Sequence, residues 1–372
     1  MKLYFSFLCF SLMISQSFSQ KIIPLNTKNE KQTFVFDSIY SKIQNKRIIC
    51  IGETQHRIET FSRCKSELVK YLHEKCGYNI LAFEGSLMKI SNAYYNIAND
   101  SLALKESLYR IWQTESVLEL FSYVKMNMSS SNPLILSGFD VKSGASRSVS
   151  LWLKNIFKSV NPSFAESIYR TDTLFIIKTT PFDHSDKLQP ISEKEEIIFQ
   201  TFYSSVIDSL ENYKKRFIDQ RILSANQFSI VKQSLINRKY LAKFVTFKDI
   251  KMASSYRDSI MTKNILWLTN DLYKNEKIII WAADAHISKK TVKNYSEFNQ
   301  RSSIEMLPAE LKDQTQTISL NFIKQAPKDI KKQIYLLPGN AFFIDHPDYM
   351  NEEFEGVIYF KETESFEKYI VK

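Results

Sequence analysis

Four short, continuously apolar segments mark the predicted strands of this chain. They are residues 48–51, 80–83, 134–136 and 278–281. Apolar strands without alternation are typical of a sheet covered on both faces, as parallel sheets are. A helical pattern over residues 59–76, ended by Gly77, separates the first two strands and completes a strand–helix–strand unit. The pattern therefore predicts an α/β fold with a largely parallel central sheet covered by helices on both faces.

Two longer blocks have the pattern of helices. Residues 87–128 and 192–270 are rich in Leu, Ile, Tyr and Phe, and the second block contains no strand pattern. We expect it to form a helical insertion or cap before the fourth strand. Further strands are expected at residues 317–323, 341–344 and 356–360. Since no repeat or flexible linker divides the chain, we predict one α/β domain over residues 21–372.

The first 20 residues differ from the rest of the chain. Lys2 is followed by the apolar run Leu3–Ile14 and by a small polar stretch, the pattern of a secretory signal peptide. The run is too short to span a bilayer comfortably, which favours a cleaved signal over a retained anchor. Cys9 lies inside the run, which argues against a lipoprotein. We expect a secreted or periplasmic protein without a membrane span after cleavage.

The charge and the cysteines of the chain bear on whether it binds nucleic acid, forms disulfides or holds zinc. The formal net charge is +10, but the lysines are scattered, whereas a nucleic-acid groove needs a coherent basic stripe with interleaved aromatic residues. We therefore expect no nucleic-acid partner. Cleavage would leave Cys50, Cys64 and Cys76. This odd number, without zinc-site spacing, implies neither a disulfide framework nor a zinc site. Cys50 is expected to be a buried thiol, and nothing indicates the oligomeric state.

An ionisable residue follows each of the four predicted strands. These residues are Glu53, Glu84, Asp140 and the pair Asp284 and His286. Ligands of open α/β sheets bind at the carboxyl ends of the strands, so we expect these side chains to share one pocket. Several acids this close cannot all ionise without partners. Perturbed pKa values and neighbouring cations are therefore expected.

Helical phase identifies the candidate cations. Lys65 shares the apolar face of the helix over residues 59–76, where it either points inward or extends its ammonium group to solvent. Arg257 and Asn264 lie on the inward stripe of a second helix. A buried arginine requires a carboxylate partner, so one is predicted for Arg257. Asp258 is expected to point about 100° away from that stripe.

Two of the five histidines belong to this group. His56 lies in the turn after the first strand, and His286 follows the fourth. The other three are expected at the surface: His73, His184 and His346.

Several motifs are similar to those of a known family. The segment Gly52–Phe61, GETQHRIETF, resembles the G-E-x-x-H-G-x-x-E-F signature of the erythromycin esterase-like family. Arg257–Asn264 resembles its R-D-x-x-M-x-x-N helix, and Trp281–His286 resembles its W-A-H-N-x-H strand end. Smaller matches occur at residues 77–84, 138–140 and 356–360. The motifs occur in family order, so the resemblance covers most of the mature chain.

The resemblance implies an α/β enzyme that hydrolyses an ester, in the best-known members the lactone of macrolide antibiotics, and hence a role in antibiotic resistance. It implies a histidine base without a nucleophilic serine, no cofactor and no clearly required metal. By position His56 is the base, with Glu53, Glu84 and His286 as further catalytic residues. Substrate contacts are expected from Lys65, Arg257, Asp284, Asp140, Glu59 and Asn264.

Four positions depart from the family pattern. Lys65 stands where the family carries arginine, so the cation is kept without the bidentate fork. Arg57 replaces the glycine after the first histidine. Ala283 and Asp284 replace the first histidine and the asparagine of the strand-end motif. The loss of one site histidine leaves open whether the substrate is a macrolide.

The residues themselves point to the same reaction type. The chain has no Gly-x-Ser-x-Gly elbow, so no serine nucleophile is indicated. We hypothesise that His56 activates water while Glu53 or Glu84 orients its ring. His286, with Lys65 or Arg257, would stabilise the oxyanion of a small-molecule ester or lactone.

Two alternatives remain at this stage. The same carboxylates and histidines could hold a divalent ion in a metal-dependent hydrolase, although no His-Glu-x-x-His motif is present. A related fold also occurs in haem-uptake proteins, so a non-catalytic protein that binds haem or another small ligand is the second alternative.

Overall fold

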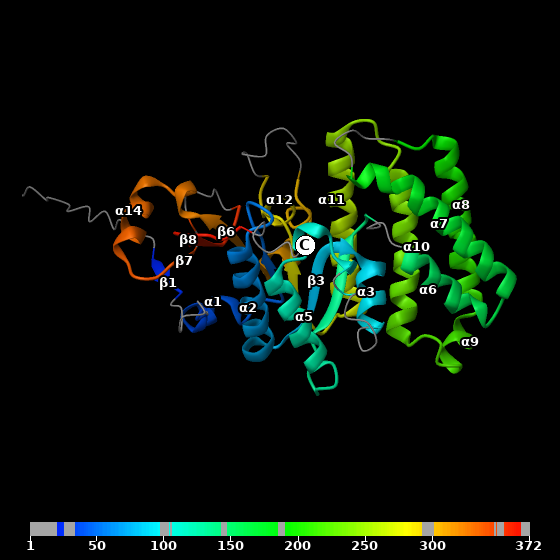
Figure 1. Ribbon diagram of the computed structural model, residues 1–372, viewed down its shortest axis with the longest axis horizontal. Helices are drawn as coiled ribbons and strands as arrows, with labels where there is room; N and C mark the ends of the chain where they lie inside the picture. Colours follow the sequence, from blue (N-terminus) through cyan, green and yellow to red (C-terminus); the bar gives the residue numbers. More distant parts are fainter. Residues whose placement is uncertain are drawn as a thin grey trace, which may run out of the picture.

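A single mixed sheet forms the centre of the protein (Figure 1). The computed structural model describes residues 21–25, 34–96, 104, 106–142, 147–184, 190–291, 301–345, 347 and 353–365. The predicted signal peptide and His346 lie outside these residues. The strands run in the order β1-β7-β8-β6-β2-β5-β3-β4. Their bounds are β1 Ile22–Pro24, β2 Ile48–Ile51, β3 Tyr78–Ser86, β4 Ile135–Asp140, β5 Lys277–Trp281, β6 Thr315–Phe322, β7 Ala341–Asp345 and β8 Gly356–Phe360.

Most neighbouring strands are parallel. β2 pairs in parallel with β5 and β6, β3 with β4 and β5, and β6 with β8. Only β7 runs antiparallel to its neighbours β1 and β8 among the described strands. The predicted α/β class with a largely parallel sheet is therefore confirmed.

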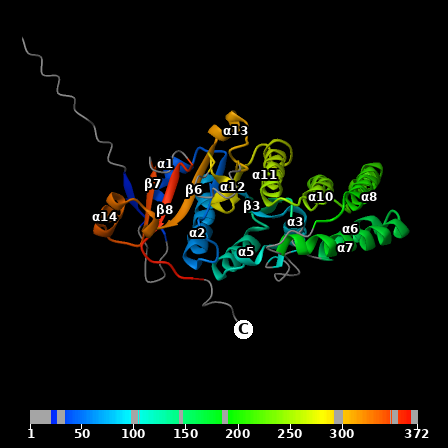
Figure 2. The same ribbon diagram turned by 90° about the horizontal axis from the view of Figure 1, so that it is seen from above.

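Helices cover both faces of the sheet, as Figure 2 shows. One face packs against α2 (Glu59–Cys76) and α5 (Glu115–Asn127). The other packs against α11 (Ile250–Trp267), α13 (Ala309–Asp313) and α14 (Lys328–Leu336). The remaining helices of the two layers are α1 Tyr40–Ile43, α3 Leu87–Asn96 and α12 Asp284–Ile287.

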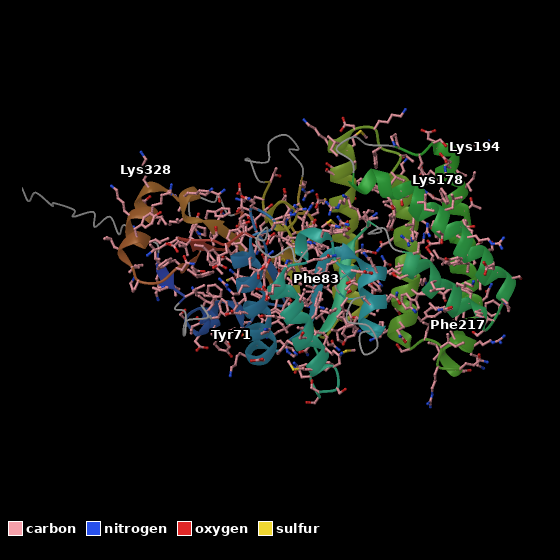
Figure 3. The ribbon with its side chains drawn as sticks, viewed as in Figure 1. Tyr71, Phe83, Lys178, Lys194, Phe217 and Lys328 are labelled. Carbon is pink, nitrogen blue, oxygen red and sulfur yellow. The ribbon has the colours of Figure 1, made fainter. Side chains whose placement is uncertain are left out.

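A helical insertion extends from the β4 side of the sheet and has its own apolar core (Figures 1 and 2). It consists of α6 Arg147–Lys158, α7 Pro162–His184, α8 Glu193–Asn212, α9 Lys214–Asp219 and α10 Ala225–Phe244, and it leads into α11. The predicted helical blocks over 87–128 and 192–270 are thus largely helical, and the insertion also includes the two helices before residue 192. In Figure 3, Phe217 lies within this unit and Phe83 within the sheet region, whereas Lys178, Lys194 and Lys328 lie at the periphery.

Local sequence signals set the boundaries of the elements near the site. Gly77 ends α2 in the left-handed conformation, with φ 71°, and its N–H bonds to the Leu72 carbonyl. The three cysteines among the described residues are free and buried, which confirms the buried thiol predicted at Cys50. Among the described residues, no helix is long and apolar enough to cross a bilayer.

Candidate active site

The first cluster lies at the carboxyl end of β2 and is centred on Glu53, which is nearly fully buried. One carboxylate oxygen, Oε1, lies 3.0 Å from Nδ1 of His56. The other, Oε2, lies 3.2 Å from Nζ of Lys65. These three residues are called the His56 cluster below. A histidine and a lysine from different elements therefore share one carboxylate.

Two tryptophans surround this cluster. The His56 ring meets Trp112 edge-on, with the ring centroids 4.9 Å apart. Lys65 Nζ lies 4.9 Å from the ring centroid of Trp112 and 4.8 Å from that of Trp281, close enough for cation–π attraction. The ammonium group also donates to the Ala282 carbonyl at 3.1 Å.

Lys65 is a buried cation. Its side chain is 0% exposed, so the alternative in which it extends to solvent is wrong. Burial lowers the pKa of Lys65, and the Glu53 carboxylate opposes that effect. Lys65 thus binds one carboxylate oxygen of Glu53, and His56 binds the other.

The second cluster is centred on Arg257 of α11, which binds carboxylates from two strands. Its Nε lies 3.0 Å from Asp140 Oδ1, and its Nη2 lies 2.6 Å from Asp140 Oδ2 and 2.8 Å from Glu84 Oε1. Tyr109 donates to the same Asp140 at 2.9 Å. The predicted carboxylate partner of Arg257 is confirmed. The second cluster, including His286 and Asp258, is called the Arg257 cluster below.

Charge pairing in this cluster outweighs burial. Burial would raise the pKa of Asp140 and of Glu84, but Arg257 and His286 lower both pKa values below their ordinary range. The same carboxylates raise the pKa of Arg257. Both acids are therefore ionised at neutral pH, and the predicted combination of perturbed acids and nearby cations is confirmed.

His286 is held between two carboxylates. Its Nδ1 lies 2.7 Å from Asp258 Oδ1, and its Nε2 lies 3.4 Å from Glu84 Oε1. Burial would lower the pKa of His286, but the Asp258 and Glu84 carboxylates outweigh it and raise the pKa. Nδ1 is hydrogen-bonded to Asp258, and Arg257 Nη1, at 3.2 Å from Nε2, is a neighbouring cation.

The prediction that Asp258 points away from the site was wrong. Its side chain is fully buried and binds His286. A rotation of about 100° along the helix describes the Cα–Cβ direction. It does not account for α12, which places the His286 ring within reach of that carboxylate.

The end of β5 connects the two clusters. The Ala282 carbonyl accepts from Lys65 in the His56 cluster, and the N–H of Ala283 donates to Glu84 Oε2 in the Arg257 cluster at 2.9 Å. His56 and His286, both within the described chain, form no hydrogen bond with each other. The predicted residues thus meet at one edge of the sheet in two adjoining networks rather than in a single ring of contacts.

Asp284 is buried next to Glu53 of the His56 cluster. Ser319 donates to its Oδ2 at 2.5 Å, its N–H donates to the Glu53 carbonyl at 3.1 Å, and its Oδ1 is unpaired among the described residues. Gly52 leaves the space for it, since a Cβ there would lie 2.0 Å from Oδ1. Burial raises the pKa of Asp284 to about 7.

This buried acid predicts a pH-dependent stability. Its pKa is about 7 when folded and about 4 when unfolded. Because the folded state holds the proton longer, stability falls as pH rises between these values. Asp284→Asn removes the titration, and we expect it to stabilise the protein by about 1–3 kcal/mol at pH 7 and little at pH 4. Thermal unfolding across pH measures this, with the exposed Asp313→Asn as the control. A gain that is independent of pH would contradict the assignment.

Two further predicted substrate-binding residues make contacts with protein atoms. Glu59, at the start of α2, accepts from the hydroxyl and the N–H of Ser116 and so caps α5. Asn264 donates to the Phe139 carbonyl at 2.9 Å and accepts from Gln233 at 3.0 Å. Asn264 thereby fixes α11 to the end of β4, which positions Arg257.

Of the remaining histidines, His73 was predicted at the surface, and this was wrong. It is buried, with Nδ1 2.6 Å from the Tyr123 hydroxyl and Nε2 2.9 Å from the Asn132 carbonyl. These contacts join α2 to α5 and to the loop before β4. The side chain of His184 lies outside the described residues.

Arg57 adopts a backbone conformation that favours glycine. Its φ is 61°, in the left-handed region, and its side chain is exposed. This region costs an L-residue about 1–2 kcal/mol. The glycine of the family motif therefore has a conformational reason, and this chain carries the strain beside His56.

Relief of this strain is measurable. We expect Arg57→Gly to stabilise the protein by about 1 kcal/mol, less the entropy that glycine adds to the unfolded chain. Arg57→Ala keeps the strain and is the matched control. Equal melting temperatures for the two variants would show that the backbone at this position is not strained.

The acids and histidines of the site are not grouped as metal ligands are. Within the described ranges, no group of three or more His, Cys, Asp or Glu side chains is arranged to hold a metal ion. The carboxylates of the site are instead bound to Lys65, Arg257 and His286.

The fold and the site define an α/β protein with two adjoining histidine–carboxylate clusters at the carboxyl edge of its sheet. The erythromycin esterase family model matches residues 73–334, and the chain belongs to this family. The resemblance predicted from the motifs is confirmed. The matched region begins after Gly52–Phe61 and includes the Arg257 and His286 motifs.

A curated relative agrees with the family assignment. The Bacillus subtilis (strain 168) protein YbfO, named a putative hydrolase, is 28% identical over 295 residues. The match covers 75% of this chain and 65% of that protein, so this chain spans just under two thirds of its relative's length.

Solved structures share the fold at low sequence identity. A Bacillus cereus protein has a TM-score of 0.71 at 14% identity, covering 89% of this chain and 92% of its own. A succinoglycan biosynthesis protein has a TM-score of 0.67 at 14% identity, covering 88% and 91%. A mutant of the erythromycin esterase EreC in its open conformation has a TM-score of 0.57 at 15% identity, covering 90% and 96%.

Proposed function

We propose that this protein is a hydrolase that cleaves a carboxylic ester or lactone with water activated by His56. The observation that carries the proposal is the asymmetry of the His56 ring. Nδ1 is bound to the buried Glu53, whereas Nε2 has no partner among the described residues and the side chain is 38% exposed. A general base needs this arrangement, with one nitrogen oriented and the other open.

The reaction follows from the charges around the ring. Nε2 of His56 takes a proton from water, and the Glu53 carboxylate stabilises the resulting imidazolium. Hydroxide adds to the ester carbonyl, and the tetrahedral oxyanion forms near positive charge. Arg257 supplies this charge, and the raised pKa of the adjacent His286 favours its protonated form. Collapse of the intermediate expels the alcohol, which receives the proton from His56.

Lys65 has a supporting role in this proposal. It is fully buried and already binds Glu53 and the Ala282 carbonyl. It therefore holds Glu53 in position for His56, and the oxyanion role passes to Arg257 and His286, whose side chains are 14% and 11% exposed. A macrolide lactone is one candidate substrate, which would connect the protein with antibiotic resistance.

A hydrolysis screen tests the proposal. The purified protein is incubated with aryl esters, simple lactones and a macrolide lactone, and acid release is measured with and without a chelator. We expect turnover of at least one ester or lactone that survives chelation. Loss of all activity after chelation, restored by a divalent ion, would support the metal-dependent alternative. No turnover together with a Soret band on adding haem would support the binding protein.

Export is a separate proposal that rests on residues 1–20 alone. Expression of the full chain, followed by cell fractionation and N-terminal sequencing, tests it. We expect a mature protein outside the cytoplasm that begins near residue 21. An intact N-terminus in the cytoplasmic fraction would refute export.

A further inference from the structure

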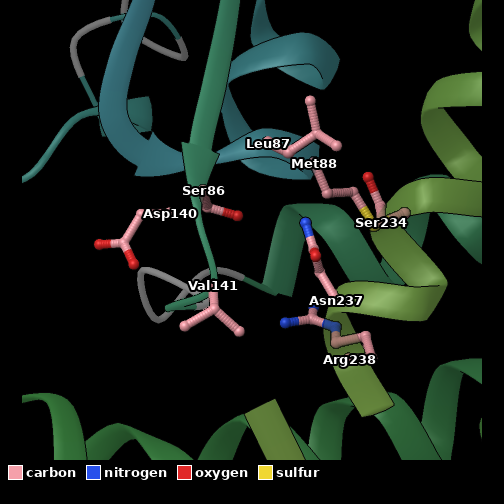
Figure 4. Close-up of a pocket in the computed structure, with 8 residues that line it drawn as sticks. All are labelled: Ser86, Leu87, Met88, Asp140, Val141, Ser234, Asn237 and Arg238. Carbon is pink, nitrogen blue, oxygen red and sulfur yellow. The ribbon is translucent and has the colours of Figure 1, made fainter. Parts of the chain in front are cut away.

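A small pocket lies between the sheet and the helical insertion, next to the Arg257 cluster. Figure 4 shows its lining, which comes from the ends of β3 and β4 and from α3 and α10. The lining residues are Ser86, Leu87, Met88, Asp140, Val141, Ser234, Asn237 and Arg238. Asp140 belongs to both the pocket and the Arg257 cluster. The pocket therefore adjoins the Arg257 cluster, which lies at the proposed reaction site.

Unpaired polar atoms distinguish this pocket from a packing defect. Both amide atoms of Asn237 and the hydroxyl of Ser234 lack hydrogen-bond partners in the described chain. The two residues are only 6% and 3% exposed. In Figure 4 the Asn237 amide extends from α10 toward Ser86. An unpaired buried polar group costs about 1–3 kcal/mol, so a site that keeps several of them is suited to a polar ligand.

The chemistry of the lining defines the ligand group. Asn237 offers a donor and an acceptor, and Ser234 offers a hydroxyl, so the complementary group both donates and accepts. Leu87, Met88 and Val141 supply apolar contacts beside these atoms. Arg238 is already paired with Asp172, with Nε 3.0 Å from Oδ1. Arg238 is therefore not available to bind an anionic group of a ligand. A neutral hydroxyl group fits the pocket best.

The size of the pocket limits what enters it. Its volume is about 230 Å³ including its opening to solvent, but the space that it encloses holds only one group of about the size of a water molecule. Only part of a substrate can occupy it. We propose that Asn237 and Ser234 form a specificity subsite that binds a hydroxyl group on the ester substrate. This inference rests on the proposed hydrolase function and adds the class of substrate, a hydroxyl-bearing ester.

A matched pair of esters tests the subsite. 6-O-acetyl-D-glucose and cyclohexylmethyl acetate share an acetyl ester on a six-membered ring, and only the first carries ring hydroxyls. We expect a higher kcat/KM for the glucose ester. Ser234→Ala and Asn237→Leu should each reduce the ratio of the two kcat/KM values by about tenfold, as expected for lost hydrogen bonds. Ser91→Ala, which removes another buried and unpaired hydroxyl outside the pocket, is the control and should leave the ratio unchanged.

Stability separates a binding role from a structural one. Because the Ser234 hydroxyl is unpaired without ligand, Ser234→Ala should keep or raise the melting temperature while it reduces the preference. A lower melting temperature with an unchanged ratio would mean that the pocket holds a buried water only, and would overturn the subsite.

Calorimetry distinguishes failure of the subsite from failure of the hydrolase proposal. In the His56→Ala background, we expect saturable binding of 6-O-acetyl-D-glucose that Ser234→Ala weakens about tenfold. Binding of this kind without turnover in the wild type would support the subsite and overturn the hydrolase. Turnover with an unchanged ratio in the variants, or no saturable binding, would overturn the subsite.

Discussion

Replacing His56 with alanine should reduce kcat/KM for the best ester of the screen by about 10²–10⁴-fold, the usual contribution of a positioned general base. The ring is 38% exposed and, among the described residues, is hydrogen-bonded to Glu53 alone, so its removal leaves no large cavity. The melting temperature should therefore change little. Initial rates with saturating and limiting substrate, together with thermal unfolding, measure both effects.

Two variants make this experiment specific. Gln55→Ala alters an exposed residue of the same loop and should keep wild-type rates. Glu53→Gln keeps the shape of the orienting residue but removes its charge. We expect it to reduce kcat/KM more than Gln55→Ala does and less than His56→Ala does. Wild-type rates in the His56→Ala variant would show that another group activates water, and His286 would then be the histidine to replace.

The strand ends could be predicted because two independent signals agree there. Continuous apolar runs located β2, β3, β4 and β5, and an ionisable residue followed each run. In a parallel sheet these ends share one edge, so proximity follows from topology alone. Helical phase predicted Arg257 on an inward face and left open whether Lys65 points inward or to solvent, and their contacts with Asp140 and Glu53 show that both point inward.

Residues that enter the site from irregular or short segments had no such signal. Trp112, in a short 3-10 helix over Arg110–Trp112, contacts both His56 and Lys65. Tyr109 immediately precedes this helix and binds Asp140. No periodicity identifies such positions, because their direction depends on how the loop between α3 and α5 returns to the sheet.

The error at His73 has a different cause. Phe61, Leu68 and Leu72 lie on the apolar face of α2, and a polar residue beside this face is expected to point to solvent. In the structure α5 packs alongside α2, and Tyr123 and the Asn132 carbonyl satisfy both ring nitrogens. A polar side chain can be buried where a neighbouring helix supplies partners, and those partners are 50 or more residues away in the sequence.

The two clusters divide the proposed chemistry between them. Glu53 has one cation and one exposed histidine, whereas Glu84 and Asp140 share the cations Arg257 and His286. The Arg257 cluster carries charge at neutral pH, because Arg257 holds the pKa values of Asp140 and Glu84 below their ordinary range, and Asp258 and Glu84 raise the pKa of His286. It is therefore suited to electrostatic stabilisation, and the proton transfer is left to His56.

Replacing Arg257 with methionine should destabilise the protein by about 3–5 kcal/mol at pH 7. The change leaves the buried carboxylates of Asp140 and Glu84 without their main partner, and breaking a buried ion pair in this way costs about this much. Arg170→Met is the matched control. Its side chain is 78% exposed and, within the part of the chain that the structure describes, pairs with Glu166, so its loss should change stability by less than about 1 kcal/mol.

The pH dependence of this loss identifies its cause. In the wild type, Asp140 and Glu84 have lowered pKa values. Their contribution to stability is therefore present above the unfolded values of about 4 and is lost as pH falls through the folded ones. Without Arg257 the carboxylates can take up protons at higher pH, which relieves the buried charge. The difference in free energy of unfolding between wild type and Arg257→Met should thus shrink as pH falls from 7 to about 4. A difference that stays constant over this range, measured by denaturant unfolding, would mean that lost packing rather than unpaired charge destabilises the variant.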